Sequence, residues 1–190
     1  MKKVLFTLTF VALCFALQAQ NVYTLKQPGL IEGDYKTFSF LDQNKKSTMD
    51  KQEILVFDDP FMTSIWVFND PKYPDAKSNA DIQKAITQEL IRKGFKKVAK
   101  GADMLVSYSV FSNDGNVKGI FTDDDGDTFS DIDETIAIKK GTLMISFIDR
   151  KTGKPLWHGF DKNALGQSTS IADTQVMKAV TSTLNSFSLD

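Results

Sequence analysis

The stretch GTLMISFIDRKTGKPLWHGF, residues 141–160, decides the fold of this chain. In its first half Leu143, Ile145 and Phe147 alternate with other residues, and this period of two is typical of a β-strand. A turn sequence with a glycine follows at residues 149–154, and the chain then returns through a second apolar run. The stretch therefore predicts an antiparallel β-hairpin.

Further strands are predicted on both sides of this hairpin. Residues 104–111 show the same alternation, and residues 35–41 place Phe38 and Phe40 on one face. Ile136 and Ile138 suggest one more strand, which runs into the strand at Gly141. Two apolar runs, residues 54–57 and 64–68, are either a pair of strands or buried runs without ladder partners.

Two segments predict helices with one narrow apolar stripe each. The first follows the start signal Ser78-Asn79-Ala80-Asp81 and ends at Gly94, which favours the left-handed backbone of a helix terminus. The second begins at residues 170–173 and carries its stripe on Val176, Val180, Leu184 and Phe187. Because each stripe is narrow, each helix is expected to lie on a flat partner.

We therefore expect an α+β fold, a two-layer sandwich. A mostly antiparallel sheet of five or six strands has two helices packed on one face. Residues 20–190 are expected to form this single domain, since a chain of that length fits one hydrophobic core.

The order of these segments resembles a known family. Its motifs here are Tyr35-Lys36-Thr37-Phe38, LIRKGF at residues 90–95, ADMLVSY at 102–108, GTLMI at 141–145, and DRKTG at 149–153 leading to Leu156-Trp157-His158-Gly159. From about Tyr35 to Phe187 the chain resembles the bacterial cell-envelope family called domain of unknown function 4136. The resemblance implies an exported protein, often a lipoprotein, without assigned activity or catalytic residues. This chain differs in having His158 where the family has arginine, and in a longer segment from Lys45 to Pro74.

The first nineteen residues have the anatomy of a secretory signal peptide. Lys2 and Lys3 precede an apolar run from Val4 to Leu17, and Ala19 supplies a small residue for cleavage. The run is too short for a membrane span, so no transmembrane segment is expected after cleavage. We expect an exported protein in the periplasm or at the outer membrane. Lipid anchoring through Cys14, the only cysteine, is the less favoured alternative because bulky Leu13 precedes it.

An acidic segment offers the one candidate metal site. Asp123, Asp125 and Asp127 surround Gly126, and calcium prefers several oxygen ligands on a loop. The EF-hand template fails, however, because it would place Phe121 at its first ligand position. We therefore expect a solvated loop between strands without a metal or other cofactor, and keep calcium as the alternative.

His158 is the only histidine and therefore the only candidate imidazole base. No Gly-x-Ser-x-Gly motif accompanies it, and apolar neighbours in a predicted strand favour a partly buried structural histidine. A pair of carboxylates for hydrolysis of an envelope polymer stays open, because such pairing is spatial.

Five aromatic residues are candidates for a binding face: Phe57, Phe61, Trp66, Phe68 and Tyr73. They would form a platform if the sheet face away from the helices stayed available, but aromatic residues in strands usually pack in the core. With 23 basic and 24 acidic residues the chain has no basic excess, so no nucleic-acid partner is expected. The favoured hypothesis is a non-catalytic envelope protein that binds or scaffolds a protein, glycan or lipid, and the alternative is the carboxylate-pair hydrolase.

Overall fold

The computed structural model describes residues 22–26, 35–41, 55–59, 62–66, 73–119, 134–153, 155–162, 164–185 and 187. The expected signal peptide, residues 1–19, lies outside this part of the chain. The elements, in chain order, are β1 (Val22–Lys26), β2 (Thr37–Phe40), β3 (Leu55–Asp59), β4 (Met62–Trp66), α2 (Ala76–Arg92), β5 (Lys96–Lys97), β6 (Met104–Val110), β7 (Gly115–Gly119), β8 (Glu134–Ile138), β9 (Leu143–Asp149), β10 (Pro155–Asp161) and α3 (Asp173–Asn185).

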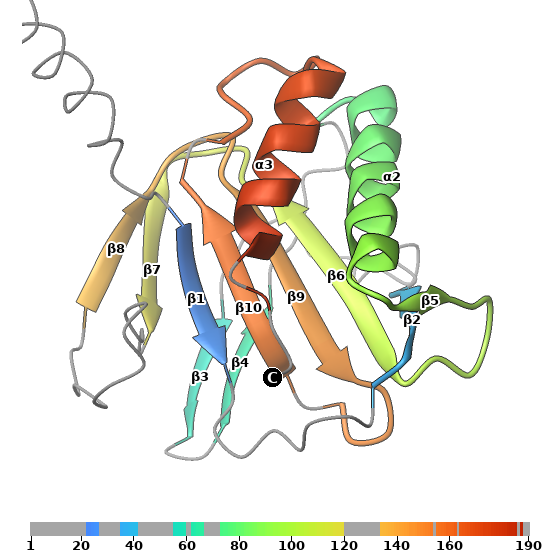
Figure 1. The fold of residues 1–190 in the computed structure, drawn as a ribbon. Helices are drawn as coiled ribbons and strands as arrows, with labels where there is room; N and C mark the ends of the chain where they lie inside the picture. Colours follow the sequence, from blue (N-terminus) through green and yellow to red (C-terminus); the bar gives the residue numbers. More distant parts are fainter. Residues whose placement is uncertain are drawn as a thin grey trace, which may run out of the picture.

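Six strands form one mixed sheet in the order β1-β10-β9-β6-β2-β5, with α2 and α3 on one face (Figure 1). The predicted hairpin is confirmed, since β9 and β10 pair antiparallel and Gly153 in their turn has a φ of 70°. β6 and β1 extend the antiparallel part, whereas β2 runs parallel to β5 and β6. A parallel pair needs a long crossover connection, and the segment containing α2 supplies it between β2 and β5. The predicted α+β architecture is therefore confirmed.

Two further hairpins lie outside this sheet. β3 pairs with β4, so the two apolar runs of the sequence are strands with ladder partners. β8 carries Ile136 and Ile138 but pairs with β7 and not with the six-stranded sheet. The expected continuation of this strand into Gly141 is wrong, because a turn closed by the bond from Thr142 N to Lys139 O (3.0 Å) separates β8 from β9.

Helix α2 begins three residues before the start expected from the sequence. Asp75 is its N-cap, and the Asp75 carboxylate accepts a hydrogen bond from Ser78 N at 2.7 Å. Ser78 lies inside the first turn, where its Oγ accepts a hydrogen bond from Ile171 N at 3.0 Å and ties α2 to the segment before α3. The predicted end is confirmed: Gly94 has a φ of 95°, and Phe95 N donates to Leu90 O.

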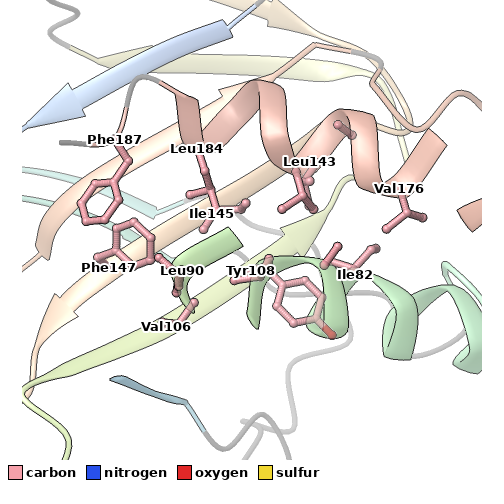
Figure 2. Packing of buried hydrophobic residues seen from close by; sticks show 14 of the residues in the cluster. Ile82, Leu90, Val106, Tyr108, Leu143, Ile145, Phe147, Val176, Leu184 and Phe187 are labelled. Atoms are coloured by element: carbon pink, nitrogen blue, oxygen red, sulfur yellow. The ribbon is translucent and has the colours of Figure 1, made fainter. Parts of the chain in front are cut away.

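The two helices run parallel and enclose the core against the sheet. Lys77 Nζ lies 2.6 Å from the Asp173 carboxylate at their N-terminal ends, and Lys93 Nζ donates to Phe187 O at the other ends. Buried side chains of α2, α3, β6 and β9 meet between the layers (Figure 2). Phe187, just past α3, packs on Phe147 with ring centroids 4.2 Å apart. Within the described residues, no helix has the length and apolar character needed to cross a membrane.

Candidate functional site

His158 lies on the sheet face opposite the helices. Its neighbour Trp157 belongs to the core between sheet and helices, so the alternation of β10 turns His158 to the other side. Across the strands His158 pairs with Ser146 of β9, and Ser146 pairs with Ser107 of β6. The register thus aligns two serines and the only histidine in one row.

The imidazole of His158 is enclosed and neutral. Its side chain is 6% exposed, and its Nδ1 lies 2.8 Å from the Oγ of Ser146. Burial lowers the pKa of His158 to about 4, because desolvation disfavours the charged form. Its Nε2 is buried without a hydrogen-bond partner among the described residues. His158 lies in the strand β10, as expected from the sequence, and its side chain is more deeply buried than the partial burial expected.

The face away from the helices is also covered at the centre of the sheet. Ser109, Met144 and Phe160 point to this face and are only 3% exposed each. The less favoured alternative, a platform on this face, requires the face to be available, and at the middle strands it is covered. The physical reason is that β9 and β10 carry large apolar side chains on both faces, as strands in a sheet interior do. In Figure 1 the β3–β4 hairpin is drawn behind the sheet, on the side away from the helices.

The five candidate aromatic residues fall into three groups. Tyr73 is core: it is 4% exposed, and its hydroxyl donates to Gly166 O at 3.3 Å. Phe57 and Trp66 belong to the strands β3 and β4, where Phe57 pairs with Ser64 and Trp66 pairs with Leu55. Phe61 and Phe68 lie outside the described residues.

Most described carboxylates serve as hydrogen-bond acceptors within the fold. Asp103 accepts from the backbone N–H groups of Lys36 and Thr37 and from the Thr37 hydroxyl, and these bonds lower its pKa. Asp149 accepts from the hydroxyl of Tyr35 and from Thr152, and its pKa is also lowered. These hydrogen bonds keep the Asp103 and Asp149 carboxylates ionised.

Asp161 differs, because half-burial raises its pKa in spite of the nearby Ser182 hydroxyl and Lys178. A raised carboxyl pKa is the property of a general acid. A glycoside hydrolase pairs such an acid with a second, ionised carboxylate. The groups that act on Asp161 are the Ser182 hydroxyl and Lys178.

The candidate calcium ligands Asp123, Asp125 and Asp127 lie outside the described residues. The strands on either side of them, β7 and β8, pair antiparallel, so the acidic segment connects two strands as expected. In the part of the chain that the structure describes, no three His, Cys, Asp or Glu side chains gather as metal ligands. The expectation of a loop without a metal therefore stays a prediction, with calcium binding as its alternative.

Three residues with defined roles were missed at the level of sequence: Ser146, Asp103 and Gly159. Ser146 becomes the partner of His158 only through the strand register, and Asp103 meets Thr37 across a separation of 66 residues. Gly159 leaves room for the Trp157 ring, since a Cβ there would lie 2.1 Å from the indole Cη2. The spacing Trp-x-Gly within one strand is the signal that could have revealed this contact, because both residues face the same side.

These features define a two-layer α+β protein whose one histidine is part of the structural interior. The chain belongs to the family described as Domain of unknown function (DUF4136), whose profile matches residues 32–187.

Solved structures give more distant similarities. A crystal structure of a PDZ domain protein from Parabacteroides distasonis ATCC 8503 has 16% identity and a TM-score of 0.48, over 86% of this chain and 34% of that chain. The PelC dodecamer from Paraburkholderia phytofirmans has 14% identity and a TM-score of 0.40, over 87% of this chain and 94% of that chain. No curated protein matches the sequence. These similarities carry no functional information.

Proposed function

We propose that this chain is a non-catalytic, exported protein of the cell envelope that binds or scaffolds an envelope partner. The observation that carries the proposal is the enclosure of His158. A serine hydrolase needs an imidazole that reaches both its nucleophile and the substrate, whereas the only imidazole of this chain is 6% exposed. The signal-peptide anatomy of residues 1–19 supports export.

The rival function is hydrolysis of an envelope polymer by a carboxylate pair. Asp161 is the one observation in its favour, because its raised pKa suits a general acid. Its neighbours weigh against it, since Ser182 and Lys178 of α3 both stabilise the ionised form. We therefore place this function second.

Affinity capture tests the proposal. The chain, purified after export and immobilised, is incubated with envelope extract, and bound components are identified by mass spectrometry. We expect one reproducible partner that an excess of free chain displaces. Polymer fragments released by the wild-type chain and not by Asp161→Asn would instead establish the hydrolase.

A further inference from the structure

One short segment concentrates positive charge. Residues 90–102 contain Arg92, Lys93, Lys96, Lys97 and Lys100 and no acidic residue, although the whole chain has a net charge of −1. This segment spans the end of α2, the strand β5 and the approach to β6. The segment is therefore strongly positive, whereas the chain as a whole is almost neutral.

The sheet brings three more cations to the same place. Register pairs join Lys97 to Phe38, Phe38 to Met104 and Met104 to Asp149, so β5, β2, β6 and β9 reach one level of the sheet together. Lys36 lies just before β2, while Arg150 and Lys151 lie just after β9. With about 4.8 Å between neighbouring strands, these positions spread over about 14 Å. We call the exposed set Lys36, Lys96, Lys97, Lys100, Arg150 and Lys151 the basic corner.

The carboxylates nearest the basic corner have other partners. Asp103 and Asp149 accept hydrogen bonds from backbone N–H groups and hydroxyls, and Lys151 acts on Asp103 only as a nearby charge. Lys97 Nζ lies 5.0 Å from the centre of the Phe40 ring. Within the described residues, none of the six side chains forms a salt bridge, so their charge is directed at the surroundings.

The shape of the basic corner indicates its partner. The side chains project from strand ends and turns over a wide area, which suits an extended anionic surface better than a single small anion.

We propose that the basic corner docks on a membrane surface that carries anionic phosphate headgroups. This inference rests on the proposed function, because it names the envelope partner as a lipid surface. The attraction is electrostatic and does not require an inserted segment, so it weakens when salt screens the charges.

Vesicle flotation tests the proposal with the chain purified after export. The probes are phosphatidylcholine vesicles with and without phosphatidylglycerol. We expect binding only to the anionic vesicles, with loss at high salt and no loss in inorganic phosphate at matched ionic strength. The triple change Lys96→Gln, Lys100→Gln and Lys151→Gln should weaken binding about 100-fold, because each lysine contributes separately near the surface.

A matched control removes the same number of charges elsewhere. Lys84→Gln, Lys139→Gln and Lys178→Gln together should stay within about threefold of wild type, since they lie outside the basic corner. Replacing the three corner lysines by arginine should preserve binding, and circular dichroism should show that all variants fold.

Equal binding by wild type and the corner variant would overturn the proposal. Corner-dependent binding to purified cell-wall glycan without binding to vesicles would overturn the lipid assignment. If vesicles are not bound but capture still yields a partner, only this inference fails. If capture fails and polymer is cleaved, the proposed function itself fails.

Discussion

At the scale of single residues, Gly159 and Trp157 form one unit of the core. The indole is 2% exposed and stacks on Phe147 with centroids 5.2 Å apart. A Cβ at position 159 would overlap the indole, so the ring can occupy this place only above a glycine. The Trp-x-Gly spacing thereby fixes the packing of β10 against Phe187.

Gly159→Ala is therefore expected to lower the free energy of unfolding by about 1–3 kcal/mol, since overpacking displaces the ring. Thermal melting measures the change. Gly115→Ala is the matched control, because its Cβ would lie 3.8 Å from Ile138, an ordinary contact, and it should change stability by less than about 0.5 kcal/mol. A Gly159→Ala variant as stable as the control would refute the packing role.

Because His158 is buried, the free energy of unfolding is expected to depend on pH. Its pKa is about 4 in the folded chain and about 6.5 when unfolded, so between these values the unfolded chain binds more protons. The stabilisation is complete above pH 6.5 and falls as the pH drops toward 4. From pH 7 to pH 5 we expect a loss of about 2 kcal/mol in chemical denaturation.

No other histidine contributes to this pH range, so His158→Gln should flatten the profile. The imidazole proton signals of the folded wild type should also show no titration above pH 5. A midpoint near 6.5 would mean that the imidazole is exposed.

At the scale of elements, Asp103 holds the short strand β2 beside β6. Its carboxylate accepts from Lys36 N and Thr37 N at 3.1 and 2.9 Å, and its own N–H donates to the Thr37 hydroxyl. β2 has only four residues, so these bonds supplement a short ladder.

Asp103→Ala should cost about 1 kcal/mol, because these partly exposed groups can bond to water instead. The amides of Lys36 and Thr37 should exchange hydrogen about fivefold faster. Asp103→Asn keeps an acceptor oxygen and serves as the milder comparison. Unchanged exchange at both amides in the alanine variant would contradict the anchoring role.

The elements that sequence predicted well are those with local causes. The end of α2 follows from Gly94, and the β9–β10 hairpin follows from alternation around a turn with glycine. The start of α2 was misplaced because Asp75 and Ser78 are both suitable caps, and Ser78 instead bonds to Ile171, 93 residues away. The covered second face was missed because alternation marks two faces without saying what lies on each.

The candidate site was less predictable, since it depends on register. Neither Ser146 nor His158 indicates the other in the sequence, and their contact exists because β9 and β10 pair with a bulge near Pro155. The basic corner likewise joins residues 36, 96 and 151 through the strand order β9-β6-β2-β5.

At the scale of the whole molecule, the export signal proposed for residues 1–19 leads to a prediction about the mature chain. Cleavage after Ala19 would remove Cys14 and leave a mature chain without cysteine. Intact mass of the protein recovered from the envelope should therefore correspond to a chain that begins at Gln20 and carries no lipid. A mass that shows acylated Cys14 at the N-terminus would establish lipid anchoring instead.

The central claim is that this chain binds the envelope without cleaving it. In the most direct measurement, the exported chain is incubated with purified envelope. The fraction of chain bound and the amount of soluble polymer released are then determined in the same sample. We predict saturable binding with no release above that of buffer alone. Time-dependent release that Asp161→Asn abolishes, while the variant melts at the wild-type temperature, would contradict the claim.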